Sequence, residues 1–130
     1  MPTATQDLLR SAQRGLTEAA VAETAGERYA RAHLAALRAA AAVLAARARP
    51  TSGRSRLRSV WSVLPVIAPE LAEWASFFAA SATKRSAAEA GIPVVSQREA
   101  DDLLRDAESF HAQVCTMLRV DRQQALPATG

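Results

Sequence analysis

Residues 96–118 read SQREADDLLRDAESFHAQVCTML, and they carry the clearest helix signal in the chain. Ser96 followed three residues later by Glu99 is a capping-box pattern, in which each side chain bonds the backbone N–H of the other residue. Apolar residues and one histidine then recur at steps of three and four, the period of a helix that buries one face. They are Ala100, Leu103, Leu104, Ala107, Phe110, His111, Val114 and Leu118. The pattern predicts a long amphipathic helix that continues to about residue 120.

The same period predicts three more long helices before this one. We expect them at residues 5–23, 26–48 and 69–90, with a short helix at residues 59–67. Thr24 and Glu27 form a second capping-box pattern that would start the second helix, although one bent helix also fits the first two segments. Together these elements predict an all-α fold, an antiparallel bundle of four long helices plus one short helix.

Length and composition agree with one helical domain. The chain has 130 residues, enough for a single hydrophobic core, and 31 of them are alanine, the strongest helix former. No stretch shows the alternation of apolar and polar side chains that is typical of a strand. We therefore expect one domain over residues 1–122, followed by a flexible C-terminal tail over residues 123–130.

The sequence lacks the signals of several protein classes. Cys115 is the only cysteine, which excludes an intramolecular disulfide and a cysteine-rich metal site. Phosphate-loop, dinucleotide and nucleophile-elbow motifs are absent. The first residues lack a secretory pattern, and the most apolar run, residues 34–46, is too short to cross a bilayer. We expect a cytoplasmic protein without membrane contact, metal or cofactor.

Positive charge is concentrated in one part of the chain. The net charge is only +3, yet residues 28–69 contain eight arginines and no acidic residue. Arginine binds phosphate through paired, charge-assisted hydrogen bonds, so this segment predicts an interface for RNA or another polyanion. The candidate residues of that interface are Arg31, Arg38, Arg47, Arg49, Arg54, Arg56 and Arg58.

These arginines have two other interpretations. Of the 16 basic residues, all but Lys84 are arginine, a bias that a GC-rich genome also produces. The connector at residues 47–58 should resist burial, because each guanidinium needs water or a partner. It could pair instead with the acidic last helix, within the molecule or across a dimer.

Histidine, cysteine and acidic residues offer few catalytic or metal sites. His33 and His111 each lie on an apolar stripe, which is typical of a partly buried, hydrogen-bonded histidine. Cys115 follows His111 by one turn and is expected to be an inert helical thiol. Glu108 and His111 match one half of a di-metal carboxylate motif, but the sequence contains no second copy.

Four stretches carry a family resemblance. They read ERYARAHLAALRAA at residues 27–40, RSVW at 58–61, APELAEWA at 68–75 and READDLLRDAE at 98–108. Over about residues 5–120 the chain resembles a small actinobacterial family of the HEPN superfamily of all-helical domains. The resemblance implies a bundle of four or five helices that often forms a homodimer. It also implies RNA binding, and some HEPN domains are metal-independent ribonucleases.

The resemblance supplies candidate catalytic residues as well. The ribonucleases of this superfamily carry an arginine, four to six residues and then a histidine, in a site between two protomers. Two pairs here match that spacing, Arg28 with His33 and Arg105 with His111. The histidine would act as general base or acid for the 2′-hydroxyl, and the arginine would stabilise charge on the phosphate.

We expect a non-catalytic HEPN-like domain that binds RNA or another polyanion through residues 28–69, or else a protein partner. One alternative is a HEPN-type ribonuclease that acts as a dimer, in a toxin-like or stress-response role. Another alternative is a structural or adaptor bundle.

Overall fold

The computed structural model describes residues 3–47 and 59–125, and every regular element within them is a helix. The elements are α1 (Ala4–Ala20), α2 (Ala25–Arg47), α3 (Val60–Ile67), the 3₁₀ turn η2 (Pro69–Leu71), α4 (Ala72–Glu89) and α5 (Gln97–Ala125). The predicted all-α bundle of four long helices and one short helix is therefore confirmed.

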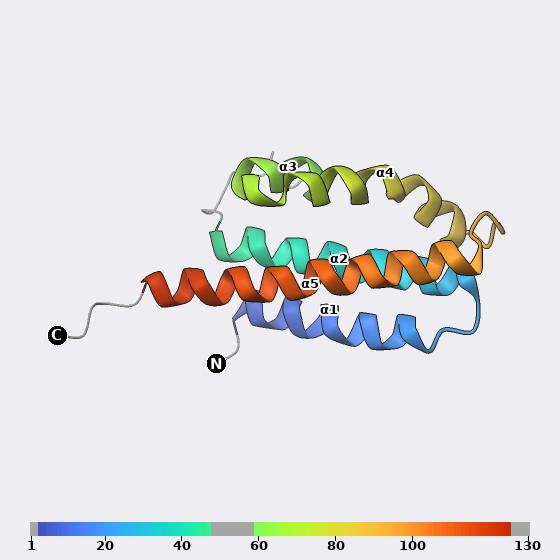
Figure 1. Cartoon of the computed structure of the whole chain (residues 1–130), viewed down its shortest axis with the longest axis horizontal. Helices are drawn as coiled ribbons and strands as arrows, with labels where there is room; N and C mark the ends of the chain where they lie inside the picture. The colour runs from blue at the N-terminus through green and yellow to red at the C-terminus, as the bar shows by residue number, and fades with distance from the viewer. Residues whose placement is uncertain (1–2, 48–58, 126–130) are drawn as a thin grey trace.

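Helix α2 lies at the centre of the bundle and contacts α1, α3, α4 and α5 (Figure 1). The chain runs in one direction along α1 and α4 and in the other along α2 and α5. The first two helices pack side by side as a hairpin, so the single bent helix that also fitted the sequence is wrong. The Thr24 hydroxyl accepts the Glu27 N–H at 3.1 Å, and this bond starts α2 afresh after the turn.

Side-chain caps also fix where the other long helices begin. The Ser96 hydroxyl accepts the Glu99 N–H at 3.1 Å, and the Glu99 carboxylate accepts the Ser96 N–H at 3.1 Å, so the predicted capping box is confirmed. Thr3 and Gln6 form a further reciprocal box at the start of α1, which the sequence analysis did not predict.

Small side chains allow α2 to pack closely on both sides. Nine of its residues are buried, and six of these are alanine. Ala35 and Ala42 are both buried, and Ala35 lies against α1. A β-carbon placed on Gly15 of α1 would lie only 3.2 Å from that of Ala35. Glycine at this position therefore sets the separation of the two helices.

Enlarging Gly15 is expected to push the hairpin apart. Gly15→Leu should lower the free energy of unfolding by about 1–3 kcal/mol, because the added side chain meets Ala35 in a packed interface. Gly26→Ala is the control, because its new β-carbon would meet Ala88 at an ordinary 3.8 Å. Urea unfolding of both variants measures the loss of stability. If Gly15→Leu is as stable as the parent, α1 and α2 are not packed closely at this position.

Aromatic rings fill the core between α3, α4 and α5. Phe78 is fully buried at its centre. Its ring stacks on Trp61 with centroids 5.0 Å apart and on Trp74 at 5.8 Å, and it meets Phe110 of α5 at 5.3 Å. This cluster fixes the position of the α3–α4 layer relative to α5.

Two predicted helix boundaries differ from the structure. The third long helix begins as the 3₁₀ turn at Pro69, and regular α-helix follows from Ala72. Helix α5 continues to Ala125, so residues 123–125 are helical and do not belong to the predicted tail. Glutamine and alanine favour helix, and Asp121 in the preceding turn is held by Arg47 of α2. Residues 126–130 of the predicted tail lie outside the described residues.

No helix within residues 3–47 and 59–125 combines the length and apolar character that a membrane span requires.

Candidate nucleic-acid interface

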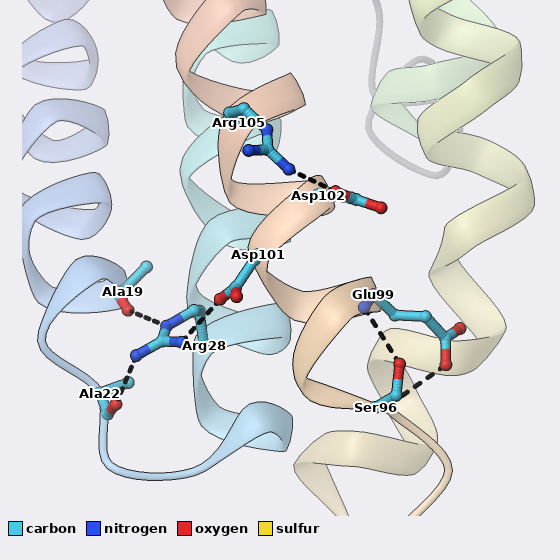
Figure 2. A network of polar contacts seen from close by, with 8 residues as sticks. All are labelled: Ala19, Ala22, Arg28, Ser96, Glu99, Asp101, Asp102 and Arg105. Atoms are coloured by element: carbon cyan, nitrogen blue, oxygen red, sulfur yellow. Dashed lines mark hydrogen bonds and ion pairs between the residues drawn. The ribbon is translucent and has the colours of Figure 1, made fainter.

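All three nitrogens of the Arg28 guanidinium bond to groups of the bundle (Figure 2). Its Nε donates to the carbonyl of Ala19 at 3.1 Å, and its Nη2 donates to the carbonyl of Ala22 at 3.0 Å. Its Nη1 pairs with the Asp101 carboxylate at 2.7 Å. Arg28 thus joins the end of α1 to α2 and α5 and is only 19% exposed.

Arg47 is held in a similar way at the other end of α2. Its Nε and Nη2 donate to the two oxygens of Asp121 at 2.9 and 3.2 Å, and it pairs with Glu70 at 3.0 Å. The hydrogen bond from Arg47 holds the pKa of Glu70 below its usual value. Arg47 was a candidate for phosphate binding, but here it ties α2 to η2 and α5.

Arg105 lies on the exposed side of α5 and pairs with Asp102 (Figure 2). Asp101 lies four residues before Arg105, yet the two side chains do not pair. Asp101 instead pairs with Arg28 from the neighbouring α2. A contact between helices has thus replaced the contact within one helix.

Six other arginines make no hydrogen bond or ion pair with any residue that the structure describes; two of them, Arg119 and Arg122, lie on α5, and the other four lie on the α1–α2 hairpin. Arg10 and Arg14 lie on α1, and Arg31 and Arg38 lie on α2. Arg38 is half-buried and the other three are exposed. We call these four residues the basic hairpin face.

Helix geometry places these four residues on one side of the α1–α2 hairpin. Arg38 Nη1 lies 3.8 Å from the β-carbon position of Gly15, so this side chain reaches α1 at the residue that follows Arg14. A helix turns about 100° per residue, which puts Arg38 about 180° around α2 from Arg47, whose side chain contacts α5. The basic hairpin face therefore points away from α5. Arg31 is two turns from Arg38 on the same side.

The ring of His33 is buried among aromatic side chains. It is 1% exposed, and it meets Trp61 and Phe78 edge-on at 5.9 and 5.8 Å. Its Nε2 lies 2.8 Å from the carbonyl oxygen of Phe78, which can only accept, so Nε2 carries the proton and donates. Burial lowers the pKa of His33, and the ring is therefore neutral at pH 7. The predicted hydrogen bond of His33 is confirmed, and the ring is fully rather than partly buried.

The buried His33 should make stability depend on pH. Because its pKa is lowered in the folded protein, the unfolded chain binds a proton at higher pH than the native state does. Stability is then complete above about pH 6.5 and falls as the pH drops, by at most about 1.4 kcal/mol per pH unit for one proton. Urea unfolding between about pH 5.5 and 7.5 should show this loss in the parent and much less of it in His33→Gln. An equal slope in both proteins would exclude His33 as its source.

His111 lies beside Cys115 on the half-buried side of α5. The Cys115 sulfur is 3.8 Å from Nε2 and 4.0 Å from Nδ1 of His111. Burial raises the pKa of the Cys115 thiol, so the reactive thiolate is scarce at pH 7. This agrees with the expectation of an inert cysteine, although the residue is half-buried rather than fully buried.

A model of the family described as SAV_6107-like HEPN matches residues 19–115, about three quarters of the sequence. The chain belongs to this HEPN family. The resemblance to the HEPN superfamily is thereby confirmed, and the helical bundle is the fold expected of such a domain. No match was found among curated proteins or among solved structures.

In this HEPN domain, neither arginine–histidine pair forms a site within one chain. Arg28 and His33 lie about 140° apart around α2, and their side chains contact opposite neighbours, α1 and α5 for Arg28 and α4 for His33. Arg105 and His111 are about 120° apart around α5, with Arg105 paired to Asp102. Within the described part of the chain, no three His, Cys, Asp or Glu side chains gather to hold a metal ion.

The outcome for the predicted phosphate-binding residues is mixed. Arg31 and Arg38 belong to the basic hairpin face, whereas Arg47 is engaged by two carboxylates. Arg10 and Arg14 were not among the predicted residues, although their four-residue spacing places them on one side of a helix. The remaining candidates lie outside the described residues, and these are Arg49, Arg54, Arg56 and Arg58.

Proposed function

We propose that this HEPN domain binds RNA through the basic hairpin face, together with the arginines of residues 49–58, and does not cleave it. The observation that carries the proposal is a set of four arginines on one side of the hairpin with no partner among the described residues. A guanidinium that is not held by a carboxylate keeps its donors for phosphate. The four arginines lie on two antiparallel helices, which suits an RNA backbone that crosses both helices.

The charged residues around the basic hairpin face leave it available for an anion. Three acidic residues lie one helical turn from these arginines, but none is within ion-pair distance of them: Asp7 before Arg10, Glu18 after Arg14 and Glu27 before Arg31. The acidic residues of α5 lie elsewhere, and Asp101 and Asp102 already pair with other arginines. RNA is favoured over an acidic protein because an RNA strand carries a phosphate at every nucleotide. Each of these phosphates can accept a bidentate pair of hydrogen bonds from an arginine.

Several contacts argue against catalysis by a single chain. A general base must reach the proton that it removes, and His33 is enclosed and bonded to a backbone carbonyl. Arg28 would have to leave three bonds to reach a phosphate. His111 is half-buried beside Cys115, and it lies about 120° around α5 from Arg105. A homodimer, which the resemblance implies, stays a prediction.

Fluorescence anisotropy with a labelled single-stranded RNA, at several salt concentrations from about 50 to about 200 mM, tests the proposal. Arg14→Gln with Arg38→Gln should weaken binding about tenfold and should lower the slope of log affinity against log salt by about 1.4. The matched control is Arg98→Gln with Arg105→Gln, which removes the same charge from the acidic helix. The control should bind RNA like the parent.

Other results would redirect the functional assignment. Equal losses in both double variants would show that net charge alone attracts RNA, and the basic hairpin face would be rejected. Absence of RNA binding by the folded parent would reject the proposal in favour of a protein partner. RNA cleavage that is lost in His33→Ala or His111→Ala would support the ribonuclease alternative. Changing Arg54, Arg56 and Arg58 together to Ser measures how much the connector at residues 47–58 contributes to RNA affinity.

A further inference from the structure

An open groove lies at the end of the bundle where α1 begins and α5 ends (Figure 1). Its volume is about 880 Å³, within the range of about 300–1,000 Å³ that is typical of small-molecule sites. The part of α5 that lines it runs from Cys115 to Ala125, which corresponds to about 15 Å along the helix axis. The groove is therefore long enough for an extended ligand.

The wall of this groove is more apolar than polar. Leu9 of α1, Ala46 of α2 and Leu118 of α5 contribute to it. Leu9 and Leu118 pack against the core cluster on one side, but both are only partly buried because their other side is open to the groove. Covering such apolar surface with an apolar ligand is favourable, since water is released from both.

Positive charge lies along the same groove. Arg119 and Arg122 line it from α5, and neither has a hydrogen-bond or ion-pair partner in the described part of the chain. They are three residues apart, which makes them neighbours on the helix surface, with β-carbons about 5–6 Å from each other. Arg119 also lies close to Cys115: burial raises the pKa of that thiol, and the charge of Arg119 opposes the rise. Both guanidinium groups can therefore reach one anionic head group in the groove.

Acidic side chains do not cancel this charge. Asp121 is the one acidic residue among the described residues that line the groove, and Arg47 donates to both of its carboxylate oxygens, at 2.9 and 3.2 Å. Asp7 lies in the first turn of α1, but it is about 160° around that helix from Leu9 and so lies on another side. The start of α1 at Thr3 also lines the groove and adds the partial positive charge of a helix N-terminus. The groove therefore favours an anion.

We propose that the groove between α1 and α5 binds an anionic amphiphile, a ligand with one carboxylate head and one unbranched acyl chain. The carboxylate lies between Arg119 and Arg122, and the chain lies along Leu9, Ala46 and Leu118. An inorganic anion would leave the apolar wall in water, and a neutral lipid would not use the two guanidinium groups. The site uses none of the four arginines of the basic hairpin face, so it is independent of the RNA-binding proposal.

Calorimetric titration of the full chain with octanoate, below its micelle concentration and at constant ionic strength, tests the groove. Octanoate should bind saturably, whereas 1-octanol and octylammonium should bind at least about tenfold more weakly. Affinity should rise from hexanoate to decanoate by about two- to fourfold for each added CH₂, since a fully buried CH₂ contributes about fourfold. Saturating octanoate should also slow the alkylation of Cys115 by iodoacetamide at least about threefold, because this residue lines the groove.

Two double variants test the head group. Arg119→Gln with Arg122→Gln should weaken octanoate at least about tenfold and leave 1-octanol within about twofold, because only the carboxylate loses its partners. The matched control is Arg14→Gln with Arg38→Gln, which removes two arginines that also lack a partner among the described residues. The control should bind octanoate within about twofold of the parent, since salt screens charges that do not touch the ligand.

Two single variants test the apolar wall while both arginines are unchanged. Ala46→Phe places a ring in the groove and should weaken octanoate at least about tenfold. Ala45→Phe makes the same change at the preceding residue of α2, which is also exposed but does not line the groove, and it should bind like the parent. Circular dichroism establishes that both variants are folded.

The proposal is overturned if octanoate does not bind saturably to the folded parent, or if 1-octanol binds as tightly as octanoate. It is also overturned if bound octanoate leaves the alkylation rate of Cys115 unchanged, because the ligand would then lie elsewhere. Octanoate affinity equal to that of the parent, in either the Arg119→Gln with Arg122→Gln protein or the Ala46→Phe protein, would overturn it as well.

Discussion

Phe78→Ala is expected to lower the free energy of unfolding by about 3–5 kcal/mol, enough to unfold much of a marginally stable domain. Phe78 is fully buried, and its ring contacts Trp61, Trp74 and Phe110 from three separate helices. Removing the ring leaves a cavity that these rigid neighbours cannot fill. Chemical unfolding followed by circular dichroism and tryptophan fluorescence measures the loss.

Phe77 provides a matched control for this substitution. It precedes Phe78 on α4 and has the same side chain, but it is 39% exposed. Phe77→Ala should cost only about 1–1.5 kcal/mol, because much of its ring already contacts water. Similar costs for the two variants would mean that the aromatic cluster does not hold the α3–α4 layer in place.

Arg28→Met is expected to cost about 2 kcal/mol of stability, an effect unusual for a charged residue at a helix surface. The methionine keeps most of the apolar stem but removes all three hydrogen bonds. The carbonyl of Ala22 then loses its bond to the guanidinium, and the end of α1 is no longer tied to α5. Chemical unfolding measures the cost, and hydrogen exchange should show faster opening of the last turn of α1.

Two variants test which of these bonds matters. Arg31→Met changes an exposed arginine on the same helix and should stay within about 0.5 kcal/mol of the parent. Asp101→Asn removes only the partly exposed ion pair, which should contribute less than about 1 kcal/mol. If Asp101→Asn costs as much as Arg28→Met, the bonds from Arg28 to the carbonyls of Ala19 and Ala22 contribute nothing to stability.

Periodicity and helix-start signals predicted most of the fold. The Ser96–Glu99 box located the start of α5 to the residue, because a capping box is a local interaction within four consecutive residues. The close seam at Gly15 was not predicted, because a glycine inside a helical pattern signals by itself only lower helix propensity. Its role depends on Ala35, which lies twenty residues away and becomes a neighbour only after the hairpin has formed.

The site was predicted less well than the fold. A concentration of arginines along the sequence does not reveal which of them meet carboxylates from other helices. Arg28 and Arg47 pair with Asp101 and Asp121, more than seventy residues away, whereas Arg31 and Arg38 have no such partner in the part of the chain that the structure describes. The burial of His33 was predicted because its neighbours on the helix repeat are apolar, a property that one segment carries by itself.

The central position of α2 also has a kinetic consequence. Its seam with α1 joins segments close in sequence and can form early, within the time that helical hairpins need. Another side of α2 is covered by α5, which follows about fifty residues later, so that side stays uncovered until the last helix docks. A folding intermediate would therefore expose the alanine-rich side of α2, and aggregation should compete with docking at this step.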